Sequence, residues 1–167
     1  MSATGLYGKL PAHGDFIRRN LPGDAVAAWD GWAASLLQAG PARLGAQPFA
    51  AAWDAMPCWC LSLPGGACGA APLCGVMAAS RDAVGRRFPL LLAAPVADAA
   101  EGWFAALAEA AHMAIAAASP ADALLASLPP PEGSGAPRGW WNAALEWAVP
   151  ALPPLPHALR LLGQAPA

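Results

Sequence analysis

The chain has 167 residues, of which 57% are hydrophobic and 12% are charged, and its formal net charge is −2. This length suits one domain with a sizeable core, and the nine scattered Lys and Arg residues form no basic stripe for a nucleic acid. The charged share is about half of the usual value of roughly 25%. We therefore expect a protein partner, or a second copy in a homodimer, to cover part of the uncharged surface.

The sequence predicts a cytoplasmic protein without a membrane span. The N-terminus, Met1–Tyr7, has neither the basic region nor the apolar region of a signal peptide. The most apolar helical stretch, residues 103–118, is interrupted by Glu109 and His112, and residues 88–96 contain two prolines. Neither segment has the ~18 uncharged apolar residues that a spanning helix needs.

The N-terminal part predicts two short strands and a long helix. Residues 4–10 alternate in character, and residues 15–18 can return as a second strand after a turn. A helix then begins, with Asn20 or a neighbour as its N-cap and Pro22 in its first turn. Its apolar residues follow the 3–4 spacing of a buried stripe, and Gly40–Pro41 is expected to end it.

The middle of the chain predicts one short helix and three strands. Phe49 and Trp53, four residues apart, mark the helix. Strands are predicted at residues 58–63, 73–79 and 88–94. The last is almost continuously apolar, which is typical of a central strand.

Helices are predicted after this third strand. Asp98 and Glu101 have the spacing of a capping box and are expected to begin a helix that runs to Ala118. A shorter helix is expected from Ser119, and residues 129–135 are rich in Pro and Gly, as in a loop.

The C-terminal residues predict weaker structure. Trp141, Leu145 and Ala148 have the spacing of a brief helix, and the Pro-rich tail that follows is weakly helical. We expect residues 1–128 to form the main domain, and residues 129–167 to form a Pro-rich loop and a helical extension that packs on it.

The fold class predicted from this order is α+β, in a single domain. The order strand-strand-helix-strand-strand-strand-helix suits a central antiparallel sheet of about five strands flanked by helices. Profilin-like and longin-like domains have this arrangement.

The four cysteines, Cys58, Cys60, Cys68 and Cys74, lack the spacing of a zinc site. On a strand, Cys58 and Cys60 would face the same side and suit the core. We favour core thiols over a metal site or a disulfide, because the cytosol is reducing.

No motif for catalysis or for a cofactor stands out. Residues 5–10 carry two glycines and a lysine, but the spacing is too short for a phosphate loop and no Ser or Thr follows the lysine. His13, His112 and His157 are far apart in sequence, and no G-x-S-x-G elbow is present. The sequence therefore predicts that the protein is not an enzyme and holds no cofactor and no metal.

Polar residues cluster in residues 9–19 and 80–87. In a structural interpretation, Asp82 caps a turn, Gly85 supplies a positive φ, and Asp15 pairs with Arg86 to join the two loops. In a functional interpretation, the loops form one recognition surface. The candidate residues are Lys9, His13, Asp15, Arg18, Ser80, Asp82, Gly85 and Arg86.

These segments carry a resemblance to a known family. The segment GLYGKLPAHGDFIRRNLP from Gly5, followed by WDGW from Trp29, resembles the start of TagF/ImpM proteins. The segment SRDAVGRRFPL from Ser80 resembles their second signature, S-x-D-x-V-G-R-x-F-P-L. The match covers roughly the first hundred residues, and beyond Pro95 only the helical character agrees.

The resemblance implies an accessory protein of the bacterial type VI secretion system. Members of this family are regarded as posttranslational regulators that hold assembly or firing in check, through the forkhead-associated scaffold protein. A structural or assembly subunit of the apparatus is the alternative, and a hydrolase acting in the same pathway is a third possibility.

Overall fold

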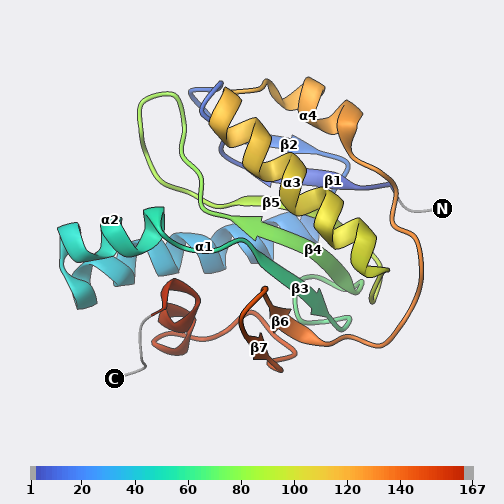
Figure 1. Ribbon diagram of the computed structural model, residues 1–167. Coiled ribbons are helices and arrows are strands. Elements are labelled where there is room, and N and C mark those ends of the chain that lie inside the picture. Colours follow the sequence, from blue (N-terminus) through green and yellow to red (C-terminus); the bar gives the residue numbers. More distant parts are fainter. Residues whose placement is uncertain (1–2, 164–167) are drawn as a thin grey trace.

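The computed structural model describes residues 3–163 and shows one sheet between two layers of helices (Figure 1). Along the chain the elements are β1 (Gly5–Gly8), β2 (Ile17–Arg19), α1 (Gly23–Leu44), α2 (Ala46–Asp54), β3 (Trp59–Leu63), β4 (Leu73–Ala78), β5 (Leu90–Ala94), α3 (Glu101–Ala117), α4 (Ala121–Ser127), β6 (Gly139–Trp141), β7 (Glu146–Trp147) and the 3₁₀ helix η1 (His157–Leu162).

The sheet contains seven strands within the described residues, in the order β2-β1-β5-β4-β3-β6-β7. Every neighbouring pair is antiparallel. Both faces are covered, because residues of α1, α2 and η1 share one apolar core cluster and residues of α3 and α4 share the other. Leu91 and Leu92, adjacent on β5, belong to different clusters, as the period of two in a strand requires.

The predicted α+β class and the single antiparallel sheet are confirmed, but the strand number and the arrangement differ. The two extra strands are β6 and β7, in a region that we expected to be a brief helix. Trp140 and Trp141 explain the difference, since each is buried in a different core cluster. Adjacent side chains reach opposite faces in a strand but not in a helix. The profilin-like or longin-like arrangement is not confirmed.

The long helix α1 differs from the prediction at both ends. It continues through Pro41 to Leu44, and Gly40 lies against the ring of Phe49, where a Cβ would be 2.2 Å from a ring carbon. The glycine is therefore there for close packing of α1 on α2 rather than as a stop signal. At the other end Pro22 is the N-cap, and Asn20 has a left-handed φ of 58°.

The capping box predicted for α3 is wrong. Ala100 occupies the N-cap and no side chain caps the helix. Asp98 and Glu101 instead pair with Arg138, whose guanidinium lies 3.8 Å from the centre of the Trp141 ring. Both acidic residues thus bind Arg138, the residue directly before β6.

Tryptophan indoles attach the C-terminal segment to the rest of the fold. Trp32 and Trp59 donate their indole N–H groups to main-chain carbonyls of this segment, at N···O distances of 2.8 and 2.9 Å, and Trp140 donates to a carbonyl within the segment at 2.9 Å. A buried indole needs such an acceptor, and loop carbonyls provide one. The segment after residue 138 is therefore part of the sheet and of one core.

All four cysteines are free thiols, with Cys68 and Cys74 buried and Cys58 and Cys60 half-buried. Cys58 and Cys60 pack against the same core cluster, as expected for two positions on one side of a strand. Over residues 3–163, no group of His, Cys, Asp and Glu side chains is arranged to hold a metal ion. In that range no helix is long and apolar enough to cross a membrane.

Candidate functional site

The two polar segments of the sequence lie side by side at one end of the sheet. One is the loop between β1 and β2, and the other is the connection between β4 and β5. Three hydrogen bonds join them: Ser80 Oγ to the carbonyl of Lys9 (2.7 Å), the Ala83 N–H to the carbonyl of His13 (2.8 Å), and Arg86 Nη2 to the carbonyl of Gly14 (2.9 Å).

The connection between β4 and β5 folds as a small hairpin, residues 80–88. Arg81 and Arg87 form an isolated antiparallel bridge, and the Gly85 N–H donates to the carbonyl of Asp82 at 3.0 Å to close the turn. Gly85 has a φ of 87°, which residues with a Cβ rarely adopt. The predicted positive φ at Gly85 is confirmed, and it turns the chain back toward β5.

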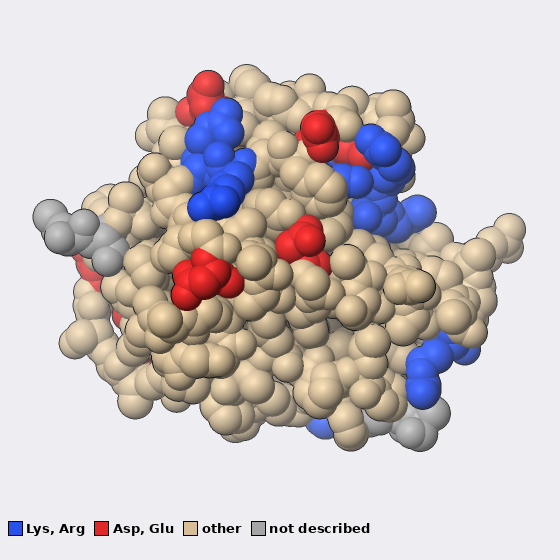
Figure 2. Space-filling view, turned by 180° about the vertical axis from the view of Figure 1, so that it is seen from behind, with Lys and Arg blue, Asp and Glu red and all other residues tan. Residues whose placement is uncertain are grey.

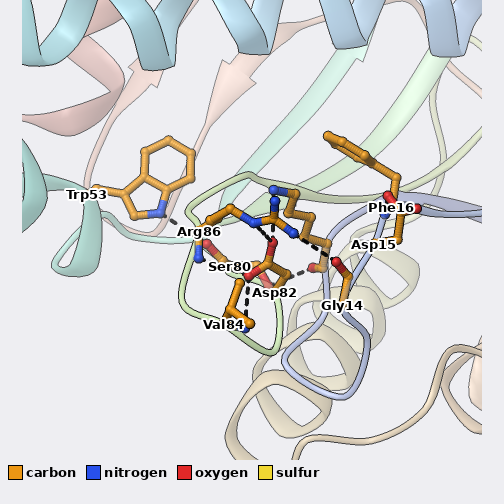
Figure 3. Close-up of polar contacts among 9 residues, drawn as sticks. Gly14, Asp15, Phe16, Trp53, Ser80, Asp82, Val84 and Arg86 are labelled. Atoms are coloured by element: carbon orange, nitrogen blue, oxygen red, sulfur yellow. Dashed lines mark hydrogen bonds and ion pairs between the residues drawn. The ribbon is translucent and has the colours of Figure 1, made fainter.

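Asp82 is the centre of this hairpin and is buried (Figure 3). Its Oδ1 accepts the N–H groups of Val84 (3.0 Å) and Arg86 (2.9 Å). Its Oδ2 accepts Arg86 Nε (2.7 Å) and lies 3.1 Å from Lys9 Nζ. Burial alone raises the pKa of the Asp82 carboxyl, but the bonds from Arg86, Lys9 and Val84 outweigh it and hold this pKa well below its usual range.

The expected ion pair between Asp15 and Arg86 is wrong. Arg86 bonds to Asp82 and Gly14, whereas Asp15 Oδ1 accepts the N–H of its neighbour Phe16 at 2.7 Å (Figure 3). The turn at Gly85 brings the Arg86 side chain next to Asp82. Its guanidinium therefore pairs with the carboxylate of Asp82 and not with that of Asp15. The two loops are joined, as expected, but Arg86 connects them through the carbonyl of Gly14 while it is held by the buried Asp82.

His13 and Arg18 serve other contacts. His13 Nε2 accepts the N–H of Ala121 at 3.0 Å, which attaches the loop to the start of α4. Arg18 Nη2 donates to the carbonyl of Leu21 at 3.2 Å, just before α1.

Burial differs among the eight candidate residues: three are buried, His13 is half-buried, and Asp15, Arg18, Gly85 and Arg86 are exposed. Lys9, Ser80 and Asp82 are buried and, together with the exposed Arg86, make the contacts that hold the loops in place. We call these four residues the Asp82 cluster. Asp15 is exposed, and so is 63% of the Arg86 side chain.

Two exposed apolar residues of these loops were not among the candidates. Phe16 is 44% exposed and Val84 is 73% exposed. Phe16 stacks on Tyr7 with ring centroids 5.9 Å apart and meets the edge of Phe88 at 4.8 Å, so its position is fixed. An apolar residue at the tip of a polar turn was the sequence signal that could have identified them. We define the loop surface as Asp15, Phe16, Val84 and Arg86.

Charge is sparse elsewhere on the molecule. Figure 2 shows one face on which the acidic and basic side chains form a few separate groups, with uncharged surface between them. Many of the basic groups are paired, such as Arg19 with Asp122 and Arg87 with Asp54.

The fold and the site together define an α+β domain in which two signature loops are fixed against each other at one end of an antiparallel sheet. The family model described as "TagF N-terminal domain, Type VI secretion system-associated" matches residues 5–130. This match spans most of the chain, so the protein belongs to the TagF family and is an accessory protein of the type VI secretion system.

A solved structure supports the same assignment over nearly the whole chain. The crystal structure of PA0076 from Pseudomonas aeruginosa PAO1 is 27% identical in sequence and superposes with a TM-score of 0.82. The alignment covers 99% of this chain and 96% of that one, so it includes the C-terminal strands that lie beyond the family model. No curated protein sequence gives a significant match.

Proposed function

We propose that this protein is a cytoplasmic regulator that represses assembly or firing of the type VI secretion system. In this proposal it acts by binding, without catalysis, and its direct partner is the forkhead-associated scaffold protein of the same apparatus. The loop surface is the contact site.

The observation that supports this proposal most strongly is the exposure of Phe16 and Val84 on loops that the Asp82 cluster holds rigid. Apolar side chains exposed at fixed positions next to a guanidinium are typical of binding surfaces, where aromatic residues and Arg contribute most. A rigid surface also loses little conformational entropy on binding. Both loops carry the family's sequence signatures, which agrees with a function that the family shares.

The test is direct binding of the purified protein to the scaffold protein from the same secretion cluster. Val84→Asp places a charge at a position that is 73% exposed, and its N–H bond to Asp82 can remain. We expect this change to raise Kd about tenfold or more while thermal stability stays unchanged. Met113→Asp, at a 58% exposed position on α3, is the matched control and should leave Kd unchanged.

The same proteins separate the regulator from a structural or assembly subunit. A repressor lowers secretion by the apparatus when it is overproduced, and Val84→Asp should remove this effect. If the wild-type protein fails to bind the scaffold but purifies in fixed ratio with the assembled machine, the structural alternative is correct. Equal loss of binding in Val84→Asp and Met113→Asp would reject the loop surface as the contact site.

A further inference from the structure

A cleft of about 470 Å³ lies beside the 80–88 hairpin, and Ser80 of the Asp82 cluster forms part of its lining. The end of α2 forms one wall, α3 forms the second, and the end of β4 with the hairpin forms the third. Its volume is in the range of protein sites that bind small groups or side chains of a partner.

Among the residues that the structure describes, the charged lining of the cleft leaves one arginine without an ion-pair partner. Arg87 donates from Nε and Nη2 to the two carboxylate oxygens of Asp54, at 3.0 and 2.9 Å. These bonds, and more weakly the nearby charge of Arg81, lower the pKa of the Asp54 carboxyl. Arg81 itself is exposed and has no ion pair or side-chain hydrogen bond with any residue from 3 to 163. Within residues 3–163, one positive charge at the cleft is therefore not neutralised by an ion pair.

The rest of the accessible lining consists of the exposed His112 and of apolar side chains. Ala79, Ala108 and Ile115 are half-buried and line the cleft beside the covered indole of Trp53. A ligand that fits both parts carries one negative charge next to an aliphatic group. A polyanion fits poorly, because Asp54 and the carbonyl end of α2 lie at the same cleft and repel further negative charge.

We propose that this cleft binds an acidic segment of a protein partner, with a carboxylate paired to Arg81 and a neighbouring aliphatic side chain against Ala79, Ala108 and Ile115. Arg favours carboxylates because its planar guanidinium can donate two parallel hydrogen bonds. The site is separate from the loop surface and does not depend on the proposed function.

The test uses the capped tripeptides Leu-Asp-Leu and Leu-Asn-Leu as probes, followed by NMR of the labelled full chain. The reporter is the indole N–H of Trp53, which donates to the carbonyl of Ser80 at the cleft, 3.3 Å away. Its resonance can be assigned with Trp53→Phe. We expect saturable shifts with Leu-Asp-Leu and much smaller shifts with Leu-Asn-Leu.

Arg81→Gln should weaken binding of Leu-Asp-Leu about 5-fold, the effect of one exposed ion pair. Arg43→Gln is the matched control, since Arg43 is exposed on α1 and does not line the cleft. Equal shifts with the two peptides, an unchanged affinity in Arg81→Gln, or no shift with Leu-Asp-Leu would each overturn the proposal. None of these results depends on the scaffold protein, so they leave the test of the loop surface intact.

Discussion

At the scale of single residues, Asp82 determines how the two loops meet. Its carboxylate lies 3.1 Å from Nζ of Lys9, which is itself only 7% exposed, and it also accepts two N–H groups from the main chain of the turn. A buried ion pair adds little net stability compared with an apolar pair, but removing one partner leaves the other charge buried and uncompensated. The two residues therefore depend on each other.

We expect Asp82→Asn to lower the midpoint of thermal unfolding by about 10 °C at pH 7, because Lys9 loses its counterion in a buried site. The difference between the wild type and Asp82→Asn should also depend on pH. The pKa of Asp82 is lower in the folded protein than in the unfolded chain, so its contribution is complete above the unfolded pKa of about 3.9 and is lost as the pH falls below that value.

Thermal unfolding followed by circular dichroism from pH 7 to pH 3 checks both expectations. The difference in unfolding midpoint between the wild type and Asp82→Asn should stay constant down to about pH 5 and become smaller toward pH 3. Ser35→Ala is a suitable control, since this hydroxyl bonds only within α1 at an exposed position. A difference in midpoint that does not change with pH would show that Asp82 stabilises the fold through its packing and not through its charge.

At the scale of elements, the hairpin of β6 and β7 completes the sheet. β6 pairs with β3, and without it the edge of β3 would be open in the middle of an apolar layer. Trp59 is almost fully buried and bonds to the carbonyl of Leu161, so its environment also depends on the C-terminal segment. We therefore expect the N-terminal region and the C-terminal extension to fold as one cooperative unit.

A chain that ends at residue 130, where the family model ends, should therefore not fold on its own. It loses two strands and the acceptors of Trp32 and Trp59, and it exposes both indoles. Circular dichroism and heteronuclear NMR of this fragment should show an expanded or aggregated state instead of a cooperative transition. Sharp, dispersed spectra from residues 1–130 would refute this expectation.

At the scale of the whole molecule, we expect burial to lower the reactivity of all four thiols. Burial raises the pKa of Cys58 and of Cys74 to about 12, and that of Cys60 and of Cys68 to about 11. The thiolate is the reactive form, so raising the pKa lowers the reactive fraction at neutral pH.

Alkylation by iodoacetamide at pH 8 should consequently be at least about 100-fold slower in the folded protein than in urea. The rate in the folded protein should rise as the pH approaches the raised pKa values, and mass spectrometry after a quench counts the modified sites. Fast modification of one cysteine at pH 8 would identify a local opening of the fold at that position.

Much of this architecture was predictable from the sequence, because the hydrophobic periods of α1, β3, β4, β5 and α3 are long enough to be specific. The pair Trp140 and Trp141 was misinterpreted because three residues fit a helix and a strand equally well. Asp98 and Glu101 have the spacing of a cap, and only tertiary structure brings Arg138 to them.

The candidate site was predicted in its location but not in its contacts. Sequence motifs identified both loops and the need for a positive φ at Gly85. The partner of Arg86 depends on the exact turn between Asp82 and Gly85, which the residue types alone do not determine. The exposure of Phe16 and Val84 is likewise a tertiary property, since apolar residues near the ends of strands usually turn inward.

The indole bond from Trp59 to Leu161 joins residues 102 positions apart, which has a consequence for biosynthesis. Because β6 is synthesised well after β3, one edge of β3 has no partner strand until residues 139–141 have left the ribosome. The nascent chain therefore exposes unpaired backbone groups along this edge, and the indole of Trp59, until the segment through Leu161 has been made. A stalled or prematurely terminated chain keeps that surface, which makes it a substrate for chaperones and proteases.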